Sequence, residues 1–335
     1  MTFSPRVPSR AATLTDVARA AGVGESTASR VLRNKGSFSE DVHDRVLKAA
    51  RTLNYVPNRI AGTLASTGSQ LIGIIIPTLT TSVFPDLLRG TNAAVEAAGF
   101  HSVIAVTEYE AAREEQLIES ILSWRPAGIL IAGLEHTDRG RAMLKDSGVR
   151  IVEVGDIDGQ GIDIVVGFSN YAVGRVVAEY LLKRKYRRIG YVGNEATHDL
   201  RAGKRYKAFK TTLAAAGLQL MDEEITPGLS SIQTGRDGLA RLLKREPDLD
   251  VVYFANDDMA IGGYFHCLAS GISVPDRLGL FGHNGLDIGR LAPQPLSTIR
   301  TPRGIVGEIG AKLLLSRAPS QVIDLGFELF EGMTT

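Results

Sequence analysis

The sequence predicts two dissimilar parts, an all-α head of three short helices and a longer α/β core built as two lobes of parallel sheet. Of the 38 Lys and Arg and 37 Asp and Glu, residues 1–66 hold 10 and 5, and the remainder holds 28 and 32. Apolar residues of the first part recur at helical spacing. From residue 71 onward, apolar runs alternate with amphipathic segments, which is the pattern of strands joined by helices. A basic head on a mildly acidic body indicates a polyanionic partner for the head alone.

Composition excludes several classes of protein. The 335 residues are 44% hydrophobic, which suits two or three folded domains rather than a disordered chain. Cys267 is the single cysteine, so neither an internal disulfide nor a cysteine metal cluster is possible, and a reducing cytoplasm is expected. Residues 1–12 lack the apolar run of a signal peptide and are expected to be a disordered tail. No segment approaches the roughly 20 unbroken apolar residues that span a membrane.

Three helices are expected in the head. Thr13 and Asp16 have the spacing of a capping box that begins the first helix. Gly22 supplies a turn, and a brief second helix follows over 25–32 with small or polar outward side chains. Ser39 is the expected cap of a third, supporting helix. This arrangement is typical of a helix-turn-helix. A generic three-helix bundle is the alternative, and the basic charge argues against it.

The head also carries a longer motif, with TLTDVA from 13, AGV from 21, TASRVLRN from 27 and LNYVPN from 53. This motif resembles the DNA-binding head of the lactose-repressor (LacI) family and implies a DNA-binding domain over 13–57. The implied base-reading residues are Glu25, Ser26 and Arg30, and the implied phosphate contacts are Thr15, Thr27, Ser29 and Asn34. Arg30 suits guanine because its fork of donors matches O6 and N7. Gly24 replaces the usual capping serine, so the N-terminus of the second helix is expected to be less stable.

Residues 58–68 are expected to form a hinge helix and linker between the two parts. Pro57 disfavours the helical conformation in the residue before it, which ends the third helix. A helix of about eight residues that contains glycine does not hold in water alone. Over a minor groove, paired with its dimer mate, it is expected to form and to open a base step with a leucine wedge. The DNA-contacting residues expected here are Asn58, which also caps the helix, Arg59, Ala61 and the wedge Leu64.

The core over 69–335 is expected to hold two sheets. Residues 71–77 form an apolar run of the kind shown by a strand buried on both faces. Further strands are expected at 100–106, 127–132, 151–154, 188–192, 251–255 and 278–281. Helices are expected at 87–98, 113–124, 172–185, 205–216, 235–244 and 260–270. Alternation of this length predicts parallel sheets in two lobes. The stretch 321–335 reads as one final edge strand without a heptad helix, so a dimer is expected.

A ligand site is expected past the carboxyl ends of the strands, where open parallel sheets bind their ligands. The residues just after the apolar runs are rich in Asn, Asp, His and Arg, which bind hydroxyls and carboxylates. Arg201 and Arg205 fall four apart on one face of a helix start, and a paired guanidinium face suits a carboxylate. An exposed basic helix that also includes Lys204 and Lys207 is the alternative for this pair.

The resemblance to the LacI family extends through the core, in ANDDMAIG from 255 and PLSTI from 295. It implies a periplasmic-binding-protein-like fold in which the chain crosses between two lobes three times. The crossings are expected near 160–166, 285–290 and 325–331. The N-lobe is expected over about 69–163 and 291–325, and the C-lobe over about 164–290 and 326–335. Within the family, EHT from 135, DIVVGFSN from 163 and GHNGLDIG from 282 are most similar to the gluconate-utilisation repressors.

By this resemblance an effector binds between the lobes. The expected effector-binding residues, taken from the segments past the strand ends and from the family motifs together, are Thr78, Phe84, Tyr109, His136, Phe168, Arg201, Arg205, Asn256, Asp257 and Asn284. Arg205 matches the family's effector-binding arginine, and Asn256 with Asp257 matches its hydroxyl-binding pair. Asn284 stands where many sugar-binding members have Asp, and the loss of a carboxylate favours an anionic ligand such as gluconate. Residues 284–286 read Asn-Gly-Leu where His-Gly-His is expected, so the identity of the acid stays open.

Other classes of function compete with a DNA-binding repressor. An enzyme on a Rossmann-like sheet would show a glycine-rich phosphate loop or a Gly-x-Ser-x-Gly turn, and the sequence has none. The six His residues show no paired metal spacing, so neither metal nor cofactor is expected. A transport-system sugar-binding protein would need export. The prediction is a cytoplasmic homodimer that binds near-palindromic operator DNA with an affinity modulated by a sugar acid, and a protein of the same fold with a different effector is the nearest alternative.

Overall fold

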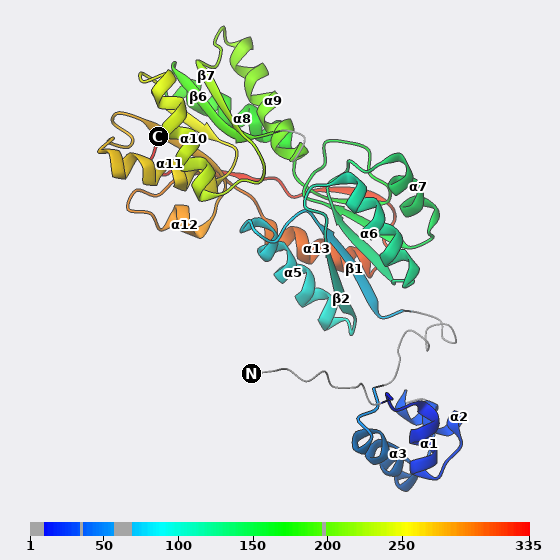
Figure 1. The fold of residues 1–335 in the computed structure, drawn as a ribbon. Helices are drawn as coiled ribbons and strands as arrows, with labels where there is room; N and C mark the ends of the chain where they lie inside the picture. The colour runs from blue at the N-terminus through cyan, green and yellow to red at the C-terminus, as the bar shows by residue number, and fades with distance from the viewer. Residues whose placement is uncertain (1–9, 34–35, 57–68, 196–198) are drawn as a thin grey trace. The chain divides into compact units, whose positions relative to one another are not determined.

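The structure is a computed structural model that describes residues 10–33, 36–56, 69–195 and 199–335. The chain divides into two compact units, residues 1–68 and 69–335, the head and the core (Figure 1). The predicted DNA contacts Asn34, Asn58, Arg59, Ala61 and Leu64 lie outside the described residues, as do positions 1–9 of the expected tail. Within the described ranges, no helix has the length and apolar character needed to cross a bilayer.

The described residues of the head form helices α1 (Leu14–Ala21), α2 (Glu25–Leu32) and α3 (Glu40–Thr52), as the sequence predicts. The Thr13 side chain accepts from the Asp16 backbone N–H, and the Asp16 carboxylate accepts from the Thr13 N–H at 2.9 Å, which completes the capping box. Gly22 ends α1 in the left-handed conformation, with φ 66°. Ser39 caps α3, whereas Gly24 begins α2 without a side-chain cap. One apolar cluster joins the three helices.

The first lobe of the core, the N-lobe, is a parallel six-stranded sheet in the order β11-β5-β4-β3-β1-β2. Its strands are β1 (Leu71–Ile76), β2 (His101–Val106), β3 (Gly128–Ala132), β4 (Arg150–Val154), β5 (Ile164–Gly167) and β11 (Gln321–Asp324). Its helices are α5 (Val83–Ala97), α6 (Ala111–Ser123), α7 (Asp138–Asp146) and α13 (Arg303–Leu314). Ile72, Ile74 and Ile76 pack in the cluster that includes α5 and α13, and Ile75 packs in the cluster that includes α6 and α7. Burial on both faces explains the unbroken apolar run of β1.

The second lobe, the C-lobe, is a six-stranded sheet in the order β12-β10-β9-β8-β6-β7, in which β12 alone is antiparallel to its neighbour. Its strands are β6 (Ile189–Asn194), β7 (Asp222–Thr226), β8 (Val251–Phe254), β9 (Gly279–Asn284), β10 (Ser297–Arg300) and β12 (Glu328–Phe330). Its helices are α8 (Asn170–Lys183), α9 (Leu200–Ala215), α10 (Ile232–Arg245), α11 (Asp257–Ser270) and α12 (Asp287–Arg290). A Cβ at Gly174 of α8 would lie 2.0 Å from the Arg205 carbonyl oxygen, so this glycine permits the close approach of α9.

Two of the three crossings between the lobes are not where the sequence analysis places them. Strand β5 pairs with β4 and β11 in the N-lobe sheet, so the first crossing follows residue 167 instead of lying at 160–166. Strand β10 pairs with β9 in the C-lobe sheet, so the second crossing follows residue 300 instead of lying at 285–290. Both strands have only four residues. The sheet that such a short segment joins is decided by its hydrogen-bonding neighbours, which its own residues do not reveal.

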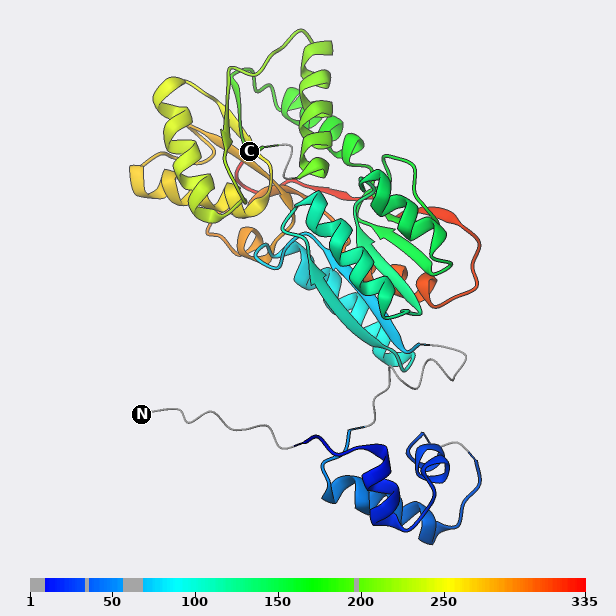
Figure 2. The ribbon, with the colours of Figure 1, turned by 45° about the vertical axis from the view of Figure 1, so that its right-hand side comes forward.

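The C-terminal stretch forms two strands where the sequence analysis expects one. Strands β11 and β12 are the outermost strands of the N-lobe and C-lobe sheets, and the third crossing joins them at 325–327, inside the expected 325–331. Figure 2 shows this red segment running across the junction of the lobes. The residues after β12 pack into the C-lobe, where the Leu280 N–H donates to the Thr334 carbonyl at 2.7 Å. The last crossing therefore ties the two lobes together far along the chain from the first.

Candidate functional site

Helix α2 packs one face into the head and leaves the other in solvent. Ala28 and Val31 are buried, with exposed fractions of 0% and 3%. Among the predicted DNA contacts, Thr15, Glu25, Ser26 and Arg30 are exposed, and Thr27 and Ser29 are half-buried. A short helix with a small apolar back and exposed polar side chains has the dimensions needed to enter a DNA major groove, which is about 12 Å wide.

A cavity lies between the N-lobe and the C-lobe, at the carboxyl ends of their strands. Seven of the ten predicted effector residues line it. They are Phe84 from α5, Tyr109 from the turn after β2, Phe168 from the first crossing, Arg201 and Arg205 from α9, Asn256 after β8, and Asn284 at the end of β9. Parallel strands bring these distant residues together because their carboxyl ends share one edge of each sheet.

Arg205 is buried in the wall of the cavity, with an exposed fraction of 6%. Its guanidinium donates to the Asn170 side-chain oxygen at 2.8 Å and to the Ala255 carbonyl at 3.3 Å. Both acceptors are neutral, so these contacts hold the group in place without cancelling its charge. Its Nε has no hydrogen-bond partner within the described residues. Because an unsatisfied buried donor costs free energy, Arg205 has the charge and the free donor that a bound anion could satisfy.

Arg201 faces the same cavity from one helical turn earlier. Its Cζ lies 5.5 Å from the centre of the Phe84 ring, and its Nε lies 3.6 Å from the Asp199 carboxylate. It also interacts with Tyr109, whose phenol stays protonated because burial raises its pKa. The side chain of Arg201 is only 14% exposed, whereas Lys207 is exposed to solvent. The arginine pair is therefore internal, and the alternative of an exposed basic face does not describe it.

Arg303, at the start of α13, brings a third guanidinium to the cavity that the sequence analysis did not identify. Its Nη2 lies 2.9 Å from the Asp86 carboxylate, and its Nη1 donates to the carbonyl of Asn284. Asn284 has φ 119°, a conformation that residues other than glycine rarely adopt. Arg303 comes three residues after β10 ends at Arg300. The rule that sites follow strand ends would have indicated Arg303 if β10 had been recognised as a strand.

Arg205 has no carboxylate partner among the described residues, unlike Arg201 and Arg303, and the cavity wall also has unused hydrogen-bonding atoms. Its charged residues are Arg201, Arg205 and Arg303 against Asp199 and Asp258. Burial, with Arg205 and Arg303 nearby, holds the pKa of His283 well below its ordinary value, so this imidazole is neutral. Within the described residues, the wall's unpartnered buried atoms are Thr81 Oγ1, Arg205 Nε, Asp258 Oδ2 and His283 Nδ1. Such a wall suits an anion that also carries hydroxyl groups.

Known proteins resemble this chain in both of its units. Residues 13–58 match the bacterial regulatory proteins of the lacI family, and residues 69–322 match the periplasmic binding proteins and sugar binding domain of the LacI family. The HTH-type transcriptional regulator GntR of Pseudomonas aeruginosa is 37% identical over 330 residues, which cover 96% of this chain and 95% of that protein. The chain belongs to the LacI family.

Two further similarities extend over nearly the whole of this LacI-family chain. The HTH-type transcriptional regulator GntR of Escherichia coli K12 is 35% identical over 328 residues, which cover 95% of this chain and 97% of that protein. A crystal structure of a LacI-family transcriptional regulator from Silicibacter pomeroyi superposes with a TM-score of 0.91 at 40% identity, covering 96% of this chain and 99% of that one. The protein is accordingly a DNA-binding transcriptional regulator with a two-lobed core of the sugar-binding type.

Three of the predicted effector residues, Thr78, His136 and Asp257, do not line the cavity of this LacI-family core. Asp257 accepts from the Leu286 N–H and from the Thr298 hydroxyl, both at 2.7 Å, and so ties α11 to β10 and to the loop after β9. Its neighbour Asp258 lines the cavity instead. The motif identifies the turn after β8 correctly. Only the rotation of the helix start decides which of the two carboxylates faces the ligand, and this corrects the prediction for Asp257.

Thr78 and His136 have partners within the N-lobe. The Thr78 hydroxyl lies 2.8 Å from that of Thr80. The His136 side chain is buried between two carboxylates, with Nδ1 2.7 Å from Glu114 and Nε2 3.2 Å from Glu153. Burial alone lowers the pKa of this imidazole, but the hydrogen bonds and charges of the two glutamates raise it to about 9. His136 is therefore an imidazolium that joins α6 to β4, a structural role that corrects the prediction of effector contact.

The stability of the core is expected to fall as the pH rises from about 6.5 to about 9. The folded-state pKa of His136 lies above the ordinary 6.5, so its contribution is complete below pH 6.5 and is lost as the pH passes about 9. A rise from 6.5 to about 9 corresponds to on the order of 3 kcal/mol in the free energy of unfolding. Thermal unfolding of the wild type, of His136→Gln and of the control His43→Gln from pH 6 to pH 10 tests this. A melting temperature that declines equally in His136→Gln would assign the effect to another group.

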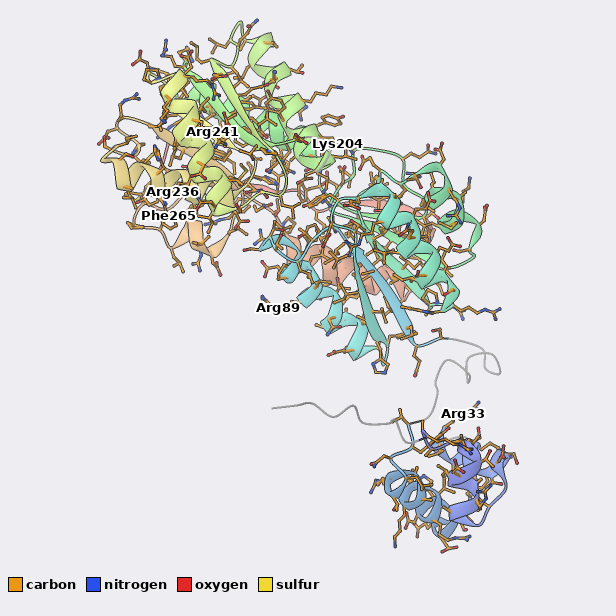
Figure 3. All side chains as sticks on the ribbon, viewed as in Figure 1. Arg33, Arg89, Lys204, Arg236, Arg241 and Phe265 are labelled. Atoms are coloured by element: carbon orange, nitrogen blue, oxygen red, sulfur yellow. The ribbon has the colours of Figure 1, made fainter. Side chains whose placement is uncertain are left out.

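Lys204 of α9 joins the two lobes beside the cavity, and Figure 3 labels it where the lobes meet. Its ammonium lies 2.5 Å from the Glu135 carboxylate and contacts the Asp156 carboxylate, both in the N-lobe. Asp156 also accepts from the side chain of Asn170 at 3.1 Å, and Asn170 in turn accepts from Arg205. Hydrogen bonds therefore run without a break from the cavity to the lobe junction. These hydrogen bonds could couple a ligand bound at Arg205 to the relative orientation of the two lobes.

Proposed function

We propose that this regulator is a repressor that binds a near-palindromic operator as a homodimer and loses operator affinity when a gluconate-like sugar acid enters the cavity between its lobes. The observation that carries the effector half is the buried guanidinium of Arg205 in the cavity wall, which contacts only neutral acceptors. The DNA half rests on the capped helix-turn-helix head and on family membership. The protein then acts in the cytoplasm, where its operator lies. No catalytic step and no cofactor are assigned to the cavity.

The cavity wall offers hydrogen-bonding partners for both the carboxylate and the hydroxyl groups of a sugar acid. Its carboxylate would accept from Arg205, whose Nε lacks a partner within the described residues, and from the neighbouring Arg201. Its hydroxyls would donate to Asp258 Oδ2 and share hydrogen bonds with the neutral His283. A neutral sugar would leave the charge of Arg205 buried without a counter-ion. A buried charge without a counter-ion has a higher free energy than one that is paired with a carboxylate. Gluconate combines one carboxylate with five hydroxyls and is the natural first compound to test.

The effector acts through a difference in affinity between two arrangements of the lobes. Acid bound at Arg205 would favour one arrangement through Asn170 and Asp156, which connect the cavity to the first crossing. Each head is attached to its N-lobe through residues 58–68, so the spacing of the N-lobes in the dimer would set the spacing of the heads. The hinge helix expected in this segment would form, and insert Leu64 between base pairs, only when that spacing fits the operator.

The test is a DNA-binding measurement on the full-length protein. Duplexes selected from a random pool identify the operator, and a salt titration separates specific binding from phosphate-only binding. The expected result is one preferred sequence from which gluconate releases the protein while glucose does not. Failure to bind any duplex at low salt would overturn the DNA half of the proposal. Release by glucose but by no sugar acid would overturn the effector half and leave the DNA half standing.

Asn284→Asp is expected to weaken gluconate binding by at least about tenfold, because it adds a buried carboxylate that repels the carboxylate of the acid in a medium of low dielectric. Asn284 lines the cavity and is 8% exposed. Calorimetric titration of the free protein with gluconate measures the change. Gln321→Glu, on the edge strand β11 and outside the cavity, makes the same change of charge and is expected to bind gluconate as the wild type does. Equal affinities in Asn284→Asp and the wild type would contradict the proposed position of the carboxylate.

A further inference from the structure

We infer that Phe38 is a positioning residue for DNA reading: its ring holds the guanidinium of Arg30 on the exposed face of the head, already ordered when it meets a guanine. Phe38 lies in the connection between α2 and α3, outside the motif positions that the family resemblance indicates for DNA contact. The inference rests on the proposed function, in which Arg30 reads a guanine. In this inference, Phe38 contacts no base itself but orients the guanidinium of Arg30, which does.

The contact joins the recognition helix to the segment before the third helix. The Arg30 Cζ lies 5.4 Å from the centre of the Phe38 ring, within the roughly 6 Å over which a ring face attracts a cation. Phe38 is half-buried and packs against the apolar cluster of the head. The next residue, Ser39, is the cap of α3. The ring therefore belongs to the folded part of the head, and it can restrict a long side chain that would otherwise sample many rotamers.

Arg30 differs from Arg45, on the third helix, in the kind of group that it contacts. The Arg45 Nε lies 3.1 Å from the Asp41 carboxylate. A carboxylate occupies N–H donors, and DNA must displace it before such a guanidinium can bind a base. An aromatic ring is attracted to the charge and takes up none of the five N–H groups in an ordinary hydrogen bond. The contact with Phe38 therefore orders Arg30 and leaves its donors available for the O6 and N7 of guanine.

Gly36 provides the space for this arrangement. A Cβ at this position would lie 2.8 Å from the Nη2 of Arg30 and 3.3 Å from the Cε2 of Phe38. Its φ of 94° also favours glycine over other residues. A side chain at 36 would displace the guanidinium or the ring. Gly36 thus leaves room for the Arg30–Phe38 pair, and Phe38 attaches the pair to the apolar cluster of the head.

The expected change in affinity is modest for each head and multiplies in a dimer. A cation–π contact at an exposed site corresponds to about two- to fivefold in an equilibrium constant. Loss of the ring should therefore weaken binding to an operator with two half-sites by about 4- to 25-fold. If the ring instead competed with DNA for the guanidinium, its loss would tighten binding. The sign of the change separates positioning from competition.

The test compares Phe38→Leu, Phe38→Tyr and Tyr55→Leu in the full chain. Tyr55 is the matched control because it is also a half-buried aromatic residue of the head's apolar cluster. Each protein is titrated with the operator selected by the wild type and with the same duplex carrying 7-deazaguanine, which lacks the N7 acceptor, at each guanine in turn. Phe38→Leu should weaken binding to the intact operator and lose the penalty for 7-deazaguanine at one position. Phe38→Tyr, which keeps the ring, should behave as the wild type, and Tyr55→Leu should keep the penalty.

Three results would overturn the inference. They are unchanged or tighter binding of Phe38→Leu to the operator, an unchanged 7-deazaguanine penalty in Phe38→Leu, and a loss of that penalty in Phe38→Tyr. Thermal unfolding monitors the folding of each head, and Phe38→Met, which conserves apolar volume, replaces Phe38→Leu if the latter unfolds. A wild type that binds no duplex, or that shows no 7-deazaguanine penalty, refutes the reading role of Arg30 itself. That outcome is distinct from a reading arginine that does not need Phe38.

Discussion

Arg205→Ala is expected to abolish the release of operator DNA by gluconate and to leave operator binding unchanged in the absence of the acid. Arg205 is buried in the wall of the cavity, and its Nε has no hydrogen-bond partner among the residues that the structure describes. Removing one partner of a buried, charged hydrogen bond costs about 2–5 kcal/mol, so gluconate affinity should fall about 30-fold or more. The head belongs to a separate compact unit and keeps its DNA contacts. Titration of gluconate into the protein–operator complex measures the effect.

Two variants control for the position and the charge of Arg205. Lys207→Ala removes a positive charge from the exposed face of the same helix and should respond to gluconate as the wild type does. Arg205→Lys keeps the charge but cannot reach both Asn170 and Ala255 with a planar fork, so it should respond only weakly. If Arg205→Ala releases the operator at the wild-type gluconate concentration, the acid binds elsewhere.

Arg30→Ala is expected to remove most of the sequence preference of the protein for its operator. A bidentate arginine–guanine pair contributes about 1–3 kcal/mol of discrimination, and a dimer on a near-palindrome makes two such pairs. The ratio of operator affinity to random-duplex affinity should therefore fall by about 30-fold to more than 1,000-fold. Binding to random DNA at low salt should persist, because the phosphate contacts remain. Competition between the two duplexes for one protein sample measures the ratio directly.

Arg33→Ala is the matched control for Arg30→Ala. Arg33 lies three residues further on at the end of α2, and Figure 3 labels it on the head. The change removes the same charge without removing the proposed base contact. It should weaken binding to operator and random DNA by similar factors and reduce the salt dependence. Equal losses of operator preference in Arg30→Ala and Arg33→Ala would show that Arg30 does not read a base.

The head and the core differ in how far their sequences predict them. In the head, the capping box at Thr13, the glycine at 22 and the cap at Ser39 act between residues a few positions apart, and the helices begin where these signals indicate. In the core, β7 has the sequence DEEIT and was not anticipated. This strand lies at the edge of its sheet, and its acidic side chains pair with Arg241 and Arg245 of α10 instead of forming an apolar run. Hydrophobic periodicity cannot detect a strand of this kind.

Some residues of the cavity could likewise be predicted from the sequence, and others could not. The rule that ligands lie past strand ends selected the chain segments that contain Tyr109, Arg205 and Asn284, and the structure places these residues around one cavity. The rule did not distinguish Asp257 from Asp258, because both follow β8 and only the helix rotation separates them. It also missed Arg303, because β10 is short and its sequence is mixed.

The sequence by itself determined the two-part architecture, the three helices of the head and the loops from which a ligand site could be built. These features follow from periodicity, capping and chain order, which involve neighbouring residues. The tertiary structure alone decided the sheet that each short strand joins, and therefore where the chain crosses between the lobes. It also decided that Arg201 faces inward, that His136 lies between two glutamates, and that Arg30 rests on Phe38. Each of these depends on groups brought together from distant segments or on the rotation of a helix, which the order of residues along the chain does not specify.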